Sequence, residues 1–275
     1  MPNTYSASII ITSYNQVRTL RFLFASLDRQ TFRDFEVVVA DDGSSDGTRE
    51  LCQEKHTFSI KFVTQEDLGY RKSKIVNLAI RQSDSSYLIF LDADVILERH
   101  FVEDHLTLKK SNHFVCGRRV DLGSFISRKI VLNEVSRGQF DRLSVRFLLS
   151  LFLSGLIKDS IGLKRALRIT HPRLRRILGY DRSLDMLGSN FSAWKEDILK
   201  VNGFNESLES YWGEDGDLYI RLRNSGKIGI GAKALCIQYH VFHPRRAPSL
   251  KNTERYQTLL GDTEYRWAVH GYRQG

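Results

Sequence analysis

The sequence predicts an α/β protein with a largely parallel main sheet. Short runs rich in Ile and Val alternate with segments of helical period, which is typical of buried parallel strands covered by helices. Acidic residues follow two of these runs, at the position where open α/β sheets bind ligands. The chain has 275 residues, 41% of them hydrophobic, which is enough to build a full core.

The individual elements follow from these patterns. The predicted strands of the first half cover residues 7–12, 36–40, 60–64 and 87–91. The predicted helices between them cover residues 17–27, a stretch that begins near Thr48, and residues 73–81. The second half is less regular: it predicts short helices at residues 197–201 and 215–225 and a strand at residues 234–239.

Composition and sorting signals exclude several classes of protein. Cys52, Cys116 and Cys236 lie far apart and form no CxxC pair, which argues against a disulfide framework and a cysteine zinc site. The first residues lack the pattern of a signal peptide. The longest apolar run, residues 147–157, is far shorter than the roughly 20 residues of a spanning helix. We therefore expect a cytoplasmic protein that does not cross a membrane.

Positive charge is concentrated in one segment. The formal net charge is +9, and residues 137–182 alone carry eleven Lys or Arg against three Asp. Within this segment, polar residues recur every fourth position from Arg142 to Lys158 among many Leu and Phe, which predicts a mostly apolar helix. Two interpretations stay open: a buried helix with a solvated basic face, or an interfacial hairpin that docks on anionic lipid.

Two carboxylates follow the predicted strand at residues 87–91. Asp92 and Asp94 would be costly to gather there without a cation between or beside them. Mg²⁺ or Mn²⁺ prefers oxygen ligands and commonly bridges to a diphosphate. The pair therefore favours a metal site over the alternative, a solvated turn.

A second acidic turn, DDGSSDGT at residues 41–48, follows the strand at residues 36–40. The turn is explained structurally if Ser45 or Asp46 caps the next helix and Gly43 adopts positive φ. Asp42 can at the same time accept a hydrogen bond from the imide of a uracil ring. Both interpretations are compatible.

Five sequence blocks together resemble a known family. They are SIIITSYN (8–15), QTFRDFEV (30–37), DDGSSDGT (41–48), FLDAD (90–94) and GEDGDL (213–218). In this order they resemble the signature blocks of inverting family 2 glycosyltransferases with the GT-A fold. GYRKSK (69–74) with Asn77, and YWGED (211–215) followed by Tyr239 and His240, are similar to the subgroup of chondroitin polymerases and galactosyl-type transferases.

The resemblance implies one GT-A domain over residues 1–245. Residues 1–95 would form its nucleotide-binding half, and residues 96–245 its acceptor half, with the basic amphipathic insert at about residues 140–180. Residues 246–275 would form a helical C-terminal tail.

The resemblance also implies roles on the donor side. Thr12, Tyr14 and Asp42 would hold the uridine, and Arg71 and Asn77 would line the nucleotide side. Further roles fall to Asp92, which would contact ribose or sugar, to Asp94 and His240, which would bind Mn²⁺ or Mg²⁺, and to Gly188, which would lie beneath the donor sugar. His243 competes with His240 as the metal ligand.

An inverting transfer needs a carboxylate that takes the proton of the acceptor hydroxyl. Asp215 is the candidate base. Neighbouring acids such as Glu214 and Asp217 are also explained by the helix dipole, since all three lie at a predicted helix start. Glu214 is expected at the sugars, and Trp212 either stacks on an acceptor ring or belongs to the core.

These expectations define a metal-dependent inverting transferase. It would move a hexose or N-acetylhexosamine from a UDP-sugar to a glycan or lipid-linked acceptor in surface polysaccharide synthesis, as a cytoplasmic enzyme that can attach to the membrane face. The alternative is a catalytically silent nucleotide- or glycan-binding module of the same fold. Nucleic acid is not expected as a partner, because the charge is too local and no RNA-binding aromatic signature accompanies it.

Overall fold

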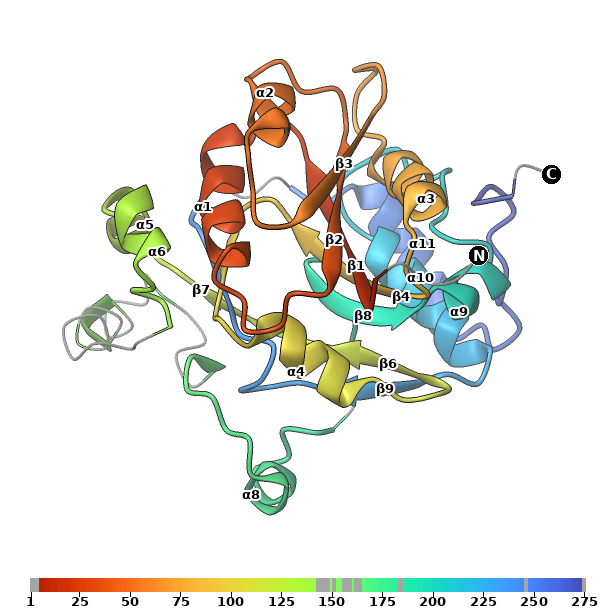
Figure 1. Cartoon of the computed structure of the whole chain (residues 1–275). Helices are drawn as coiled ribbons and strands as arrows, with labels where there is room; N and C mark the ends of the chain where they lie inside the picture. The colour runs from red at the N-terminus through yellow and green to blue at the C-terminus, as the bar shows by residue number, and fades with distance from the viewer. Residues whose placement is uncertain are drawn as a thin grey trace.

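The computed structural model describes residues 5–141, 149, 152–154, 160, 165–182, 185–244 and 247–273. It confirms the predicted α/β class: a seven-stranded sheet has the order β3-β2-β1-β4-β8-β6-β9 and lies between helices (Figure 1). The strands of this sheet are β1 (Ala7–Ser13), β2 (Phe35–Asp41), β3 (Ser59–Thr64), β4 (Tyr87–Asp92), β6 (His113–Cys116), β8 (Asn190–Trp194) and β9 (Ile228–Gly231).

The sheet is parallel except at one strand. β1 pairs in parallel with both β2 and β4, so Thr12 lies beside Ala40 on one side and Asp92 on the other. β8 runs antiparallel to β4 and β6. The carboxyl ends of β1, β2 and β4 therefore meet at one edge, where a ligand site is expected.

Alternate side chains of the strands pack into two hydrophobic cores, one on each face of the sheet. Ile9 and Ile11 pack with α1 on one face, and Ile10 packs with α3, α9 and α10 on the other. Figure 1 shows α1 and α3 on opposite sides of the sheet. The helices are α1 (Val17–Leu27), α2 (Thr48–Gln53), α3 (Lys72–Gln82), α4 (Phe101–Leu108), α5 (Ser124–Arg128), α6 (Leu132–Ser136), α8 (Pro172–Ile177), α9 (Lys195–Lys200), α10 (Glu214–Asn224) and α11 (Leu250–Leu260).

A second sheet, in the order β5-β10-β7, consists of β5 (Val95–Leu97), β7 (Arg119–Asp121) and β10 (Gln238–His240). β10 is shorter than the strand predicted at residues 234–239. Ala234 and Cys236 have positive φ, at 57° and 47°, which breaks the extended backbone before Gln238. Their apolar side chains are buried as they would be in a strand. The sequence pattern therefore predicted their burial correctly, but the extended backbone conformation that it predicted is wrong.

The predicted amphipathic segment from Arg142 to Lys158 lies largely outside the described residues. The described part of the basic region includes α8, which Arg175 fixes to the core. Its buried guanidinium donates to the carbonyls of Ile169 and Lys233 and pairs with Asp181 at 2.7 Å. Among the described residues, every helix is too short or too polar to cross a bilayer.

Candidate active site

A cavity of about 970 Å³ opens at the carboxyl ends of the parallel strands. Thr12, Asp42 and Asp92, from the ends of β1, β2 and β4, line it. The two-sided pairing of β1 forces these three side chains to the same edge, as the sequence predicted. The cavity is lined on its other sides by the segments around Gly188 and Tyr211, the start of α10, His240 and His243.

Asp42 is oriented by the chain around it. Its carboxylate accepts hydrogen bonds from the backbone N–H of Arg71 at 2.9 Å and from the side chain of Gln65. Burial raises the pKa of Asp42, although the Arg71 N–H acts against this. The carboxylate is therefore held in a fixed direction at the cavity wall.

The turn after β2 differs in detail from the expectation. Gly47, at φ 92°, is the N-cap of α2, instead of Ser45 or Asp46. Asp46 accepts from the N–H of Val17 at 2.7 Å and so satisfies the start of α1. Gly43 is required where expected, because a Cβ there would lie 2.7 Å from the backbone nitrogen of Asp67.

A half-buried lysine joins two sides of the cavity. Lys72 Nζ lies 2.9 Å from an Asp92 carboxylate oxygen and 3.2 Å from a Glu214 carboxylate oxygen. Thr12 donates to the same oxygen of Asp92 at 2.7 Å, and Tyr70 donates to Glu214 at 3.2 Å. Burial alone would lower the pKa of Lys72, but the charges of Asp92 and Glu214 raise it well above its usual value. The ammonium therefore stays charged.

Asp94 lies between two histidines. Its Oδ2 is 3.4 Å from His240 Nε2 and 3.0 Å from His243 Nε2. The fold explains this placement. His240 pairs with Val95, the residue after Asp94, in the three-stranded sheet, and His243 follows three residues later. Asp121 contacts the other ring nitrogen of His240 at 3.2 Å and orients the ring.

These three residues fit a divalent cation. One ligand atom from each lies within 4.8 Å of the others, and Asp94 Oδ1 is buried without a hydrogen-bond partner among the described residues. Burial would raise the pKa of Asp94, but the two histidines hold it well below its usual range. Burial lowers the pKa of His240, yet Asp121 and Asp94 outweigh it and raise that pKa to about 9. A cation would therefore displace protons from the imidazoles, so its affinity rises with pH.

Asp215 lies in the first turn of α10 and faces the same cavity. Its two carboxylate oxygens accept from the backbone N–H groups of Gly188 and Gly216, both at 2.8 Å. Burial and the neighbouring charge of Glu214 raise its pKa to about 6, while Lys72 and the two N–H groups act against the rise. A glycine at position 188 allows its backbone to approach Asp215 closely: a Cβ at Gly188 would lie only 3.2 Å from the Cβ of Asp215. A fixed carboxylate with this pKa is suited to accept a proton near neutral pH.

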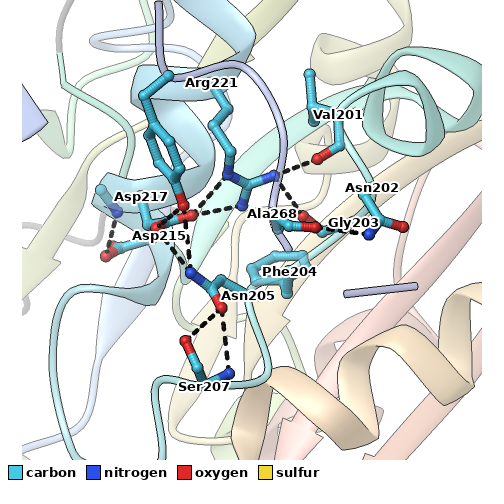
Figure 2. Close-up of polar contacts among 12 residues, drawn as sticks. Val201, Asn202, Gly203, Phe204, Asn205, Ser207, Asp215, Asp217, Arg221 and Ala268 are labelled. Carbon is cyan, nitrogen blue, oxygen red and sulfur yellow. Dashed lines mark hydrogen bonds and ion pairs between the residues drawn. The ribbon is translucent and has the colours of Figure 1, made fainter. Parts of the chain in front are cut away.

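A buried ion pair anchors the helix that carries Asp215. Arg221 is fully buried and pairs with Asp217 at 2.6 Å, one turn before it on α10. It also donates to the carbonyls of Val201 and Gly203 after α9, and Asn205 donates to Asp217 (Figure 2). Asp217 thus has a structural partner, whereas Asp215 on the same turn faces the cavity.

Not every predicted residue lines the cavity. Asn77 is fully buried on α3. Its side-chain amide donates a hydrogen bond to the carbonyl of Phe204 and accepts one from the Phe204 N–H, both at 2.9 Å. It therefore stabilises the fold and does not line the cavity, so the expectation that Asn77 lines the nucleotide side is wrong. Arg71 contributes its backbone N–H to Asp42, while its guanidinium turns to the carbonyl of Glu66.

The other predicted residues lie together, and several additional ones join them. Tyr14, Gly188, Trp212 and Glu214 all line the cavity. Lys72 is a further lining residue that lies in the quoted GYRKSK block but was not predicted, because a lysine at a helix start is ordinarily solvent-exposed. Gln16, Tyr70, Arg119, Ser189 and Tyr211 also line the cavity. Tyr70 and Tyr211 lie in the quoted GYRKSK and YWGED blocks, whereas Gln16 and Arg119 lie in no quoted block.

Comparison with known proteins identifies the family. The glycosyl transferase family 2 profile matches residues 8–156, more than half of the chain, so the chain belongs to this family. The profile named N-terminal domain of galactosyltransferase matches residues 173–244. The resemblance found in the sequence is thereby confirmed.

Curated relatives include two chondroitin synthases. The chondroitin synthase of Escherichia coli is 26% identical over 80% of this chain and 32% of its own length. That of Pasteurella multocida is 36% identical over 80% of this chain and 23% of its own. An Escherichia coli UDP-Glc:α-D-GlcNAc-diphosphoundecaprenol β-1,3-glucosyltransferase is 30% identical over 48% of this chain and 55% of its own. The chain spans a third or less of the chondroitin synthases.

Solved structures confirm the GT-A fold. TarS 1–349 of S. aureus in complex with UDP-GlcNAc gives a TM-score of 0.60 at 16% identity and covers 92% of this chain and 66% of that one. A mannosyltransferase from Pyrobaculum calidifontis in complex with GDP-Man and Mn²⁺ gives 0.57 at 16% identity, over 90% and 59% of the two chains.

Proposed function

We propose that this chain is a metal-dependent, inverting glycosyltransferase that moves a hexose or N-acetylhexosamine from a UDP-sugar to a glycan or lipid-linked acceptor in surface polysaccharide synthesis. The observation that carries the proposal is the shared cavity: the Asp94, His240 and His243 cluster and the Asp215 carboxylate all face it. The relatives named for polysaccharide and diphosphoundecaprenol acceptors, and the solved complex with UDP-GlcNAc, support it.

The donor occupies the edge formed by β1, β2 and β4. Asp42 accepts the imide N–H of uracil, an interaction that cytosine cannot make because its N3 carries no hydrogen. Tyr14 lines the same cavity, and Thr12 with Asp92 faces the ribose or sugar. Lys72 holds the Asp92 carboxylate in place through its ion pair and balances part of the negative charge that Asp92 and Glu214 bring to the cavity.

Asp94, His240 and His243 would hold the divalent cation through one carboxylate oxygen and two imidazole nitrogens. When bound, the metal supplies positive charge that stabilises the departing diphosphate. The Mn²⁺ complex of the solved mannosyltransferase supports a metal in this fold.

Asp215 serves as the base. The acceptor oxygen forms a bond to the anomeric carbon while the bond from that carbon to the UDP oxygen breaks, and UDP leaves with the electron pair. The hydroxyl proton passes to Asp215, whose two backbone N–H contacts keep the carboxylate aimed. Attack from the face opposite the leaving group inverts the anomeric configuration.

Product stereochemistry tests this function. The protein is incubated with Mn²⁺, the α-linked UDP derivatives of glucose, galactose, GlcNAc and GalNAc, and methyl glycosides of the same sugars. Proton NMR of the products then gives the anomeric configuration. We expect a β-linked product; an α-linked product would contradict the inverting mechanism, and no transfer to any of these or to longer oligosaccharides would favour the silent binding module.

The protein attaches, in this proposal, to an anionic surface at the cytoplasmic face of a membrane. Arg175 anchors α8, so the rest of this short helix projects outward, away from the main sheet (Figure 1). Ile177 is 81% exposed, and Arg173 and Arg176 are exposed on the same helix. Exposed apolar side chains flanked by basic ones suit an anionic bilayer surface.

Flotation with phosphatidylglycerol-containing vesicles tests the attachment. The double change Arg173→Gln and Arg176→Gln is expected to weaken binding about 30-fold at low salt, since each basic residue near the surface contributes about 1 kcal/mol. The matched control removes two exposed charges elsewhere, through Lys251→Gln and Arg266→Gln, and should bind like the parent. Equal binding of both variants, or no binding by the parent, would contradict attachment through α8.

A further inference from the structure

Trp212 has an unusual backbone conformation. Its φ is +83°, and Gly213 follows at +105°, so two consecutive residues lie in the left-handed region just before α10. A bulky residue adopts this region only where its surroundings hold it there. The conformation places Trp212 at the cavity, two positions before Glu214 and three before Asp215.

The surroundings that hold Trp212 come from the C-terminal helix. Asn252 of α11 is 5% exposed, and its side-chain amide donates to the carbonyls of Ser210 at 2.9 Å and Trp212 at 2.8 Å. Its two N–H groups thus clamp both ends of the turn. Ser249, the N-cap of α11, donates its backbone N–H to the carbonyl of Tyr211 at 3.1 Å, which closes the same turn from the other side.

A second residue of α11 holds the ring itself. Tyr256 contacts the Trp212 ring edge to face, with ring centroids 5.4 Å apart. It also packs on Gly216, where a Cβ would lie 2.5 Å from the tyrosine ring. The glycine after Asp215 therefore lets α11 approach the start of α10.

The segment after α11 is pinned to the same helix. Tyr265 donates to Asp217 at 2.8 Å, and Asn224 at the end of α10 donates to the carbonyls of Asp262 and Tyr265. Both ends of α10 are thus tied to residues 249–265. This segment lies beyond residue 244, where the second family profile ends.

We propose that Asn252 is a positioning residue that holds Trp212 as the platform for the acceptor saccharide. Tyr256 supports it by fixing one edge of the ring. The inference rests on the proposed function, because it assigns the acceptor to the Trp212 side of the cavity. Acceptor affinity would then depend on a helix that itself contributes no group to the reaction.

The test uses Asn252→Asp, which keeps the size of the side chain and removes both N–H donors. The matched control is Gln257→Glu, the same amide-to-carboxylate change at an exposed position of α11. The ring of Trp212 is observed by ¹⁹F NMR of protein labelled with 5-fluorotryptophan, its signal being assigned with Trp212→Phe. We expect Asn252→Asp to shift or broaden the Trp212 signal and leave those of Trp194 and Trp267 in place.

Kinetics provide the second readout. With the methyl glycoside that the parent uses, Asn252→Asp should raise the acceptor KM at least about fivefold, while the KM for UDP-sugar and the release of UDP in water stay within twofold. Gln257→Glu should match the parent in both assays. An unchanged Trp212 signal, or an equal rise of both KM values, would overturn the inference.

Two further results keep the outcome interpretable. If Asn252→Asp fails to fold, Tyr256→Ala is used instead, because it removes the ring contact from a half-buried position and should move the Trp212 signal and acceptor KM in the same direction. If the parent transfers no sugar, the proposed function fails, and the NMR comparison still decides whether Asn252 positions Trp212.

Discussion

Replacing Asp215 with Asn is expected to lower kcat for sugar transfer by a factor of about 10² to 10⁴, the usual contribution of a general base. An amide keeps the size of the side chain but cannot take the acceptor proton. UDP affinity should stay within twofold of the parent, since the proposed uridine and metal residues are unchanged. Steady-state kinetics and calorimetry of UDP measure the two quantities.

The pH profile follows from the raised pKa of Asp215. Only the deprotonated carboxylate accepts a proton, so kcat/KM for acceptor should rise with pH through about 6 and level off above it. The same shift has the opposite effect on stability. Because the folded pKa exceeds that of the unfolded chain, this group lowers the stability of the folded state as the pH rises from its usual pKa of 3.8 to about 6, and its effect is constant above that pH.

Glu209→Gln is the matched control for Asp215→Asn, because it makes the same type of change at an exposed position in the loop that precedes α10. It should leave kcat and the pH profile unchanged. If Asp215→Asn retained transfer with the rise near pH 6, the base would have to be another carboxylate, and Glu214 would be the first to examine.

Replacing Asp94 with Asn is expected to weaken Mn²⁺ binding at least about 100-fold, because an amide oxygen is neutral and the proposed site then has no negatively charged ligand. UDP affinity should fall to the level that the parent shows with a chelator. Manganese electron paramagnetic resonance measures the metal, and calorimetry measures UDP with and without it.

Asp34→Asn, an exposed change outside the cavity, controls for the loss of one carboxylate. Its Mn²⁺ and UDP affinities should equal those of the parent. Normal Mn²⁺ binding by Asp94→Asn would exclude Asp94 as a ligand, and a parent that binds no Mn²⁺ would remove the metal from the proposal.

The sequence could predict this edge of the cavity, because the apolar run of a buried strand shows where the strand ends. The apolar runs of β1, β2 and β4 end within a residue or two of the predictions, and each end delivers one polar side chain to the same edge. The helix over residues 17–27 was also predicted with its observed bounds. The hydrophobic pattern within each of these segments is sufficient to predict its type and its bounds.

Other features depend on contacts between distant segments. Nothing local reveals that Asn77 bonds Phe204, or that Lys72 reaches Glu214, because each partner lies far along the chain. The left-handed backbone at Trp212 is equally hidden, since it is held by Asn252. The sequence left His240 and His243 as alternatives; the structure brings both to Asp94.

Calorimetric titration of the parent with UDP and CDP, in Mn²⁺ and in chelator, tests the central claim most directly. The two nucleotides differ only in the edge of the base that the proposal places at Asp42. The account therefore predicts UDP binding that requires Mn²⁺ and is at least about tenfold tighter than CDP binding. Equal affinity for both nucleotides, or binding unaffected by the chelator, would contradict a metal-dependent uridine site in this cavity.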